Sequence, residues 1–128
     1  FKLLSIYDND IAVGFTALWV LDGFVFLEHI AIDQDKRSSG YGSKAIELIK
    51  SEFNLPIILE AEAPVTEQQI KRIAFYKRLG FNVNDYDYTQ PSYHGGEGVP
   101  LLLLSFPKPM TDADFDKFIE ETRKSAYK

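Results

Sequence analysis

A chain of 128 residues with 45% hydrophobic side chains suits one compact domain, which we expect to bury roughly two-thirds of its unfolded surface. Its 14 Lys and Arg against 19 Asp and Glu give a net charge of −5, the wrong sign for neutralising phosphate backbones, so we expect no nucleic-acid partner. The absence of Cys excludes disulfides and thiolate chemistry, and no apolar run reaches membrane-spanning length, so we predict a cytoplasmic protein without a membrane partner.

The first part of the chain, residues 1–32, is rich in β-branched and aromatic residues and is interrupted by turn residues at 8–10 and at Asp22-Gly23. This pattern predicts three strands joined by hairpins. Asp-Gly is typical of a type I′ turn, in which both central residues have positive φ.

A glycine-containing turn follows at residues 37–42, and the apolar residues after it recur at helical spacing. Leu55 to Ala61 then forms a short apolar run, which is typical of a central strand buried on both faces. Strand, helix and strand together predict a crossover between parallel strands.

A second helix is predicted to start at Thr66, whose capping-box partner would be Gln69, and to end at Gly80. The remaining predicted elements are a strand from Phe81, a long loop at Tyr86–Pro100, a strand at Leu101–Phe106 and a helix capped by Thr111.

The turn Arg37-Ser38-Ser39-Gly40-Tyr41-Gly42 lies between a predicted strand and a helix, where free backbone N–H groups and the helix dipole favour an anion. Glycine at 40 and 42 allows a ligand to approach closely, and Arg37 with the two Ser can add hydrogen bonds. By itself the motif is equally compatible with a pyrophosphate site and with a simple capped turn.

This turn resembles the Gln/Arg-x-x-Gly-x-Gly/Ala signature of the GCN5-related N-acetyltransferase (GNAT) superfamily, whose loop binds the pyrophosphate of acetyl-coenzyme A. Further along, Ala74-Phe75-Tyr76-Lys77-Arg78-Leu79-Gly80-Phe81 resembles the second signature, whose Tyr lies beside the coenzyme sulfur. The two motifs in this order are far more specific than either alone. The resemblance implies a mixed α/β fold with a mostly antiparallel sheet of about six strands, flanking helices and a splayed central parallel strand pair.

The resemblance covers nearly the whole chain and departs from the family in two places. The family's first strand and first helices have no counterpart before Phe1, so residues 1–128 are interpreted as a single acetyltransferase domain without them. The Asn often found seven residues before the Tyr is Gln69 here.

The resemblance also implies roles for individual residues. Backbone groups of the strand before the loop would bind the pantetheine arm like an added strand. The implied coenzyme-binding residues are Ile30, Ala31, Ile32, Arg37, Ser38, Ser39, Gly40, Tyr41 and Gly42. Tyr76 would protonate the departing thiolate, the alternative being a core aromatic beside Phe75.

Three carboxylates, Glu28, Glu60 and Glu62, lie inside predicted strands, where an ionised side chain needs a partner, solvent or a cleft. By alternation Glu60 and Glu62 share one face. We interpret Glu28 and Glu60 as candidate proton acceptors for an amine, the alternative being solvated strand faces or a salt bridge to Arg72.

Neither His has metal-ligand spacing, so we predict no metal; His29 is interpreted as structural, and the loop residue His94 either closes over substrate or is solvated. We expect an N-acetyltransferase that passes an acetyl group from acetyl-coenzyme A to a primary amine of a small molecule or peptide. The alternative is a coenzyme-binding regulatory module without transfer. Acceptor identity and oligomeric state stay open, a homodimer among the options.

Overall fold

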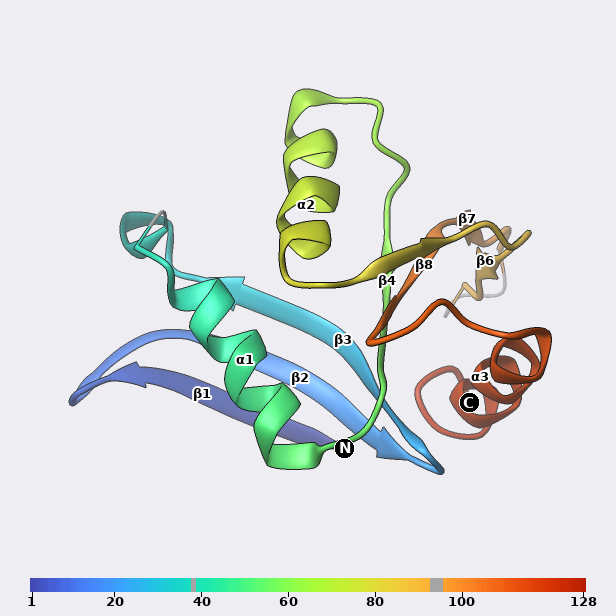
Figure 1. The fold of residues 1–128 in the computed structure, drawn as a ribbon, viewed down its shortest axis with the longest axis horizontal. Helices are drawn as coiled ribbons and strands as arrows, with labels where there is room; N and C mark the ends of the chain where they lie inside the picture. Colours follow the sequence, from blue (N-terminus) through green and yellow to red (C-terminus); the bar gives the residue numbers. More distant parts are fainter. Residues whose placement is uncertain (38, 93–95) are drawn as a thin grey trace. The chain divides into compact units, whose positions relative to one another are not determined.

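The computed structural model describes residues 1–37, 39–92 and 96–128. It divides into two compact units, Phe1–Ile57 and Ile58–Lys128, which Figure 1 traces from blue to red along the chain. Within the described ranges, no helix is long and apolar enough to cross a membrane.

The first unit begins with three consecutive antiparallel strands, β1 (Lys2–Asp8), β2 (Ile11–Leu21) and β3 (Phe24–Ile32). The predicted three-stranded hairpin arrangement is therefore confirmed. The predicted type I′ turn is wrong, because Gly23 has a φ of 87° whereas Asp22 is absent from the positive-φ residues. One left-handed residue, a glycine, is enough to reverse the chain there.

A β-bulge interrupts the pairing of β2 with β3. Ala17 pairs with His29, and the next residue along β2, Leu18, pairs with Leu27. Glu28 is therefore an extra residue on β3, opposite no residue of β2. Bulges redirect the side chain that they carry and are frequent beside functional sites.

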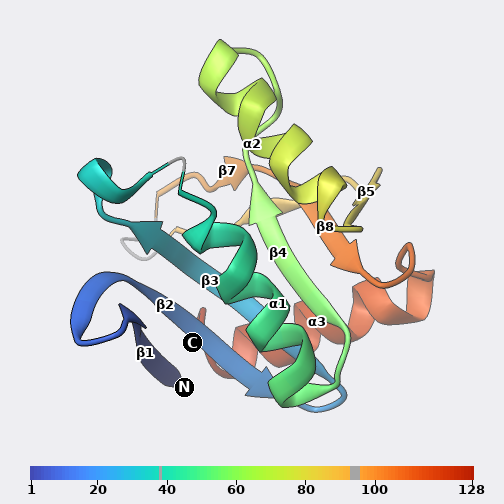
Figure 2. The same cartoon turned by 60° about the vertical axis from the view of Figure 1, so that its left-hand side comes forward.

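After β3, a 3-10 turn (Gln34–Lys36) leads into α1 (Tyr41–Phe53), which lies along the three-stranded sheet (Figures 1 and 2). The helix buries Ala45, Ile46 and Ile49, as its apolar spacing predicts. The Val25 N–H donates to the Pro56 carbonyl over 2.8 Å, so β4 (Ile57–Ala61) starts beside the start of β3. This is the geometry of the predicted crossover.

The second unit contains a sheet in the order β4, β8 (Leu102–Phe106), β5 (Asn82–Asn84), with β5 antiparallel to β8. Its helices are α2 (Glu67–Arg78) and α3 (Asp112–Lys124), and a short ribbon pairs β6 (Thr89–Gln90) with β7 (Val99–Pro100). With three sheet strands in each unit, mostly antiparallel and accompanied by helices, the predicted α/β class with about six strands is confirmed.

The predicted helix ends of this unit are confirmed. Thr66 and Thr111 each form a full capping box, with Gln69 and Asp114 respectively. Gly80 follows α2 with a φ of 92°, the left-handed conformation expected of a C-terminal stop.

A buried asparagine sets the path from β8 into α3. The Asn84 side-chain amide donates to the Leu103 carbonyl and to the Ser105 hydroxyl, and its oxygen accepts from the Met110 N–H over 2.8 Å. Nearby, the rings of Tyr86 and Phe115 stack with centroids 4.4 Å apart. Polar and aromatic contacts therefore hold the residues before α3 against the sheet of this unit.

Gly14 shows how closely β2 and β3 approach one another. A Cβ added to Gly14 would lie 2.2 Å from the Ala31 carbonyl oxygen and 3.0 Å from the Ile32 Cα, both backbone atoms that cannot rotate away. Only glycine fits at this position. The close approach fixes the register of the segment of β3 that leads into the glycine turn.

We predict that Gly14→Ala lowers the free energy of unfolding by about 1–3 kcal/mol, because the added methyl group must displace backbone. Urea denaturation followed by circular dichroism measures this. Gly96→Ala is the matched control, since among the described residues its Cβ would meet only the Ser92 hydroxyl, at 3.8 Å. Equal stability of the two variants would contradict the close approach.

Candidate active site

The N-terminus of α1 differs from those of the other two long helices. Its N-cap is Gly40, with a φ of 81° and no side-chain cap from the described residues, and its first turn contains no acidic residue. The helices α2 and α3 both have capping boxes and acidic first turns. The first N–H groups of α1 therefore lack the side-chain acceptors that serve the other two helices, and they can bind an anion.

The space around Gly40 is open. A Cβ built there meets no atom of the described residues within 4 Å, so its left-handed backbone, and not crowding by those residues, is what requires glycine. Of its neighbours in the predicted loop, Ser39 is exposed and Gly42 is half-buried. The predicted phosphate-binding residue Ser38 lies outside the described residues, as does the loop residue His94.

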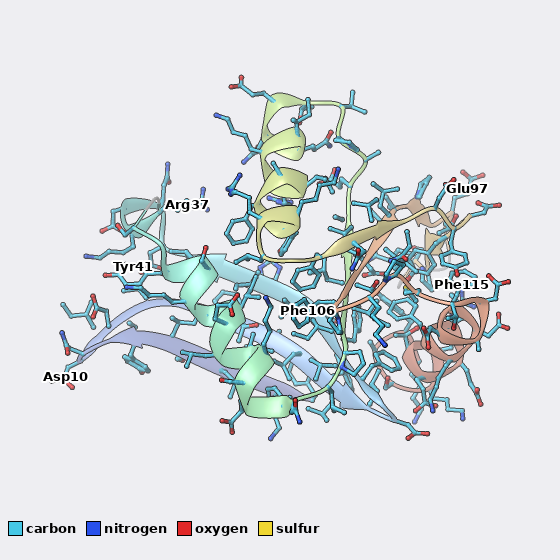
Figure 3. The ribbon with its side chains drawn as sticks, in the orientation of Figure 1. Asp10, Arg37, Tyr41, Glu97, Phe106 and Phe115 are labelled. Atoms are coloured by element: carbon cyan, nitrogen blue, oxygen red, sulfur yellow. The ribbon has the colours of Figure 1, made fainter. Side chains whose placement is uncertain are left out.

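Arg37 ties the glycine turn to the end of β3. Its Nε donates to the Ile32 carbonyl over 3.2 Å, and the adjacent Asp33 N–H donates to the Val13 carbonyl over 2.7 Å. The structure therefore brings Ile32 together with Arg37. Figure 3 shows Arg37 on the turn that leads into α1, whose first residue, Tyr41, is also labelled. Ile30 and Ala31, also predicted to bind the coenzyme, are half-buried on the preceding part of β3.

Tyr76, the predicted general acid, lies in the last turn of α2 and is 8% exposed. Its ring packs edge-on against Phe75 and Phe81, with centroid distances of 5.2 and 5.6 Å. Burial raises the pKa of its phenol and the positive charge of Arg72 lowers it in part, so the group keeps its proton at neutral pH. The hydroxyl donates to none of the described residues.

Glu28 is half-buried at the β-bulge of β3. Its carboxylate has no hydrogen bond or ion pair with any residue that the structure describes. A carboxylate without a partner in a partly dry setting is a candidate for accepting a proton.

Glu60 has a different environment, in which three donors hold its carboxylate. The Tyr127 hydroxyl donates to Oε1 over 2.5 Å, the Gln90 amide donates to Oε1 over 3.1 Å, and the Tyr88 hydroxyl donates to Oε2 in a very short hydrogen bond. Burial, together with this hydrogen bond, raises the pKa of the Tyr88 phenol, so Tyr88 stays a donor. The network favours an anchoring role for Glu60, although its predicted catalytic role stays a prediction.

Glu62 does not share the surroundings of Glu60, because β4 ends at Ala61. Its carboxylate accepts from the Gln69 amide over 3.0 Å and lies 4.0 Å from the guanidinium of Arg72. The salt-bridge alternative therefore describes Glu62. Gln69 completes the capping box of α2 at the position where the family often has Asn.

Sequence reasoning missed the tyrosines and the glutamine around Glu60. Tyr88 comes from the loop after β5, Gln90 from β6 and Tyr127 from the residues after α3, and no periodic pattern connects those segments to β4. The described residues contain no group of three His, Cys, Asp or Glu side chains arranged to hold a metal ion.

We predict that Tyr127→Phe lowers the free energy of unfolding by about 1–3 kcal/mol, because it removes a hydrogen bond to a partly buried carboxylate. Thermal or urea unfolding measures the loss. Tyr7→Phe, at a 62% exposed tyrosine on β1, is the control and should stay within about 0.5 kcal/mol of the unchanged protein. Identical stability of both variants would mean that the hydrogen bond to Glu60 contributes nothing.

Comparison with known families agrees with the fold and with the two motifs. Residues 2–83 match a family model described as an acetyltransferase (GNAT) domain. This range includes β1 to β4, the glycine turn, α1 and α2 with Tyr76. The chain belongs to the GNAT acetyltransferase family.

A sequence relative supports the same family. The chain is 32% identical over 110 residues to YjbC of Bacillus subtilis (strain 168), a provisionally assigned acetyltransferase, with 83% of this chain covered. It covers 55% of that relative and thus spans about half of its length.

Two solved structures have the same fold. A provisionally assigned GNAT acetyltransferase from Bacteroides thetaiotaomicron is 33% identical with a TM-score of 0.87, covering 96% of this chain and 70% of the other. A GNAT acetyltransferase from Elizabethkingia anophelis with acetyl-CoA bound is 17% identical with a TM-score of 0.55, covering 77% and 71%. The second comparison shows the fold, in a family neighbour that binds acetyl-CoA.

Proposed function

We propose that the chain binds acetyl-coenzyme A and transfers its acetyl group to a primary amine of a small molecule or peptide. The observation that carries the proposal is the start of α1, which has a left-handed glycine and no side-chain cap or acid among its described residues, within the family's signature turn. Family membership and the acetyl-CoA complex of a neighbour with the same fold support the choice of ligand.

Binding would start from the charge of the coenzyme. The pyrophosphate would accept hydrogen bonds from the first backbone N–H groups of α1, where the helix dipole also favours negative charge. Arg37 would contribute through the guanidinium nitrogens that its Nε bond to Ile32 leaves available. Backbone groups of Ile30, Ala31 and Ile32 would bind the pantetheine arm as a neighbouring strand does.

Transfer would proceed by direct attack, without a covalent enzyme intermediate. A deprotonated amine nitrogen forms a bond to the thioester carbon, and the carbon–sulfur bond breaks. Glu28, the carboxylate without a described partner, would accept the ammonium proton directly or through water. Tyr76 would give its proton to the departing thiolate, a role consistent with a phenol that is protonated at neutral pH.

We expect the acceptor to be cationic. Most primary amines are protonated at neutral pH, and a carboxylate near the thioester both attracts the ammonium group and takes its proton. A turnover assay that follows release of the coenzyme thiol, with polyamine, aminoglycoside and lysyl-peptide acceptors beside acidic amino acids, tests this choice. Tight coenzyme binding with no thiol release from any acceptor would favour the non-catalytic binding module instead.

Gly40→Val should weaken acetyl-CoA binding by about tenfold or more, because a branched side chain would stand in the left-handed N-cap where the pyrophosphate approaches. Isothermal titration calorimetry on a variant shown to be folded by circular dichroism measures this. Leu48→Ala, at a 67% exposed position of α1, is the control and should bind as the unchanged protein does. Unaltered binding by a folded Gly40→Val variant would refute the assignment of the pyrophosphate site.

Tyr76→Phe should leave coenzyme affinity nearly intact and lower turnover by roughly a hundredfold, because only the proton donor is lost while the packed ring remains. Steady-state kinetics together with calorimetry separate the two quantities. An equal loss of affinity and turnover would indicate a packing role. Unchanged turnover would indicate that water protonates the thiolate.

Glu28→Gln should depress turnover most at neutral pH and recover partly at alkaline pH, where the amine is already neutral. The substitution keeps the shape of the side chain and removes its charge and basicity. Glu60→Gln is the comparison and should act more on the acceptor KM. If turnover of the Glu28 variant depends on pH as turnover of the unchanged protein does, Glu28 is not the proton acceptor and is only a solvated side chain on its strand.

A further inference from the structure

A second contact at the start of α1 is used neither by the family signature nor by the proposed mechanism. The Tyr41 hydroxyl donates to Oδ2 of Asp8 over 2.5 Å, across 33 residues of sequence. Tyr41 is the first residue of α1, and Asp8 is the last residue of β1, at the turn into β2. The hydrogen bond therefore joins the β1–β2 turn to the helix end that would bind the pyrophosphate.

The hydrogen bond to Asp8 affects the acidity of the Tyr41 phenol. This bond is the main cause that raises the pKa of the phenol, with burial and the negative charge of Asp8 as smaller causes. The phenol thus keeps its proton at neutral pH and stays a donor.

The ring of Tyr41 has a cation beside it. The Lys44 ammonium lies 6.0 Å from the ring centroid, at the outer limit of a cation–π contact. Tyr41 and Lys44 are three residues apart on α1, and helical side chains lean toward the N-terminus, so Lys44 reaches back over the first turn. Its ammonium therefore lies over the ring of the first residue of α1, at the helix end where Gly40 provides no side-chain cap.

We propose that Asp8 and Tyr41 position Lys44 as an additional phosphate-binding residue for the coenzyme, a role that rests on the proposed binding of acetyl-CoA. Asp8 fixes the Tyr41 ring through the hydroxyl, and the ring limits the directions in which the long Lys44 side chain points. Holding the ammonium beside the helix N-terminus adds a full positive charge to the partial charge of the dipole. It also reduces the rotamer entropy that Lys44 loses when a phosphate binds.

The position of Asp8 has a second consequence. A carboxylate close to an anion site repels the ligand, yet this carboxylate is turned toward the Tyr41 hydroxyl by a short hydrogen bond. Removing the hydroxyl would release both the carboxylate and the lysine, which could then pair with one another. Loss of the tyrosine hydroxyl should therefore weaken binding more than loss of the carboxylate charge does.

Calorimetric titration of the whole chain with acetyl-CoA, at low and at high salt, tests the proposal. We expect Tyr41→Phe, Asp8→Ala and Lys44→Gln each to weaken binding by about fivefold to tenfold. The double variant Tyr41→Phe with Lys44→Gln should bind acetyl-CoA about as weakly as the weaker-binding single variant. The two effects should not add, because Tyr41 and Lys44 act together. The Lys44 and Tyr41 variants should also show a smaller dependence of Kd on salt, which a purely structural effect would not produce.

Conservative and matched variants complete the test. Asp8→Asn keeps an oxygen acceptor for Tyr41 and should bind acetyl-CoA as the unchanged protein does, in contrast to Asp8→Ala. Asp10→Asn removes a carboxylate from the same turn, and Tyr7→Phe removes an exposed phenol next to Asp8, so both control for charge and for substitution alone. Thermal unfolding of every variant identifies any loss that comes from folding.

Three results would overturn the proposal. In the first, Tyr41→Phe and Asp8→Ala bind acetyl-CoA as the unchanged protein does while Gly40→Val binds it weakly. This result would refute the positioning of Lys44 and would leave the proposed function standing. Asp8→Asn and Asp10→Asn could strengthen binding equally, which would make the effect one of net charge. Absence of acetyl-CoA binding by the unchanged protein would overturn the proposed function and the positioning of Lys44 together.

Where binding is observed, comparing the affinities of the unchanged protein and of Lys44→Gln for coenzyme A and for 3′-dephospho-coenzyme A shows which phosphate Lys44 binds.

Discussion

The first backbone N–H groups of α1 need an acceptor, and much of the first unit is arranged around them. Other helices of this chain satisfy the equivalent groups with threonine, glutamine and aspartate side chains, whereas α1 starts with a glycine in the left-handed region. Close contact between β2 and β3 at Gly14 sets the end of β3, and Arg37 attaches the turn to that end. The Asp8–Tyr41 hydrogen bond secures the helix from the side of the β1–β2 turn.

Two strand carboxylates, Glu28 and Glu60, differ in the side chains that surround them. Glu28 and Glu60 both lie in strands and are both half-buried. Glu60 receives hydrogen bonds from three side chains, which use most of its acceptor capacity. Glu28 has no such partner among the described residues, so its charge is balanced by nothing that the structure describes. The surroundings of Glu60 suit the anchoring of chain segments, whereas the role in proton transfer that we propose for Glu28 needs a carboxylate that other side chains do not hold.

The second unit depends on polar contacts that join its strands to segments without regular structure. Asn84 links β5, β8 and the residues before α3. Glu60 links β4 with the loop after β5, with β6 and with the residues after α3. Such satisfied networks in a partly buried setting specify one arrangement, because any alternative would leave a donor or acceptor without a partner. Tyr76 is held by a different means, the edge-on packing of its ring against Phe75 and Phe81. That packing fixes the ring while leaving the hydroxyl without a described partner.

Local chemistry determined most of the elements, and the sequence alone was sufficient to predict them. Two features were not predicted: the β6–β7 ribbon, which lies within the predicted loop, and the turn type at Asp22-Gly23. Thr66, Thr111, Gly40 and Gly80 act on backbone groups within one helical turn, so their effects are readable from neighbouring residues. The signature residues of the glycine turn and of α2 are equally local, which is why the family could be inferred from them. Tertiary structure alone decided the surroundings of the carboxylates. The donors to Glu60 lie 28, 30 and 67 residues away along the chain, and Asp8 lies 33 residues from Tyr41. The bulge at Glu28 depends on the register of β3 with β2, and the end of β4 at Ala61 separates Glu62 from Glu60. No periodicity in the sequence encodes these pairings, because they arise only when distant segments pack and each buried polar group must find its partner.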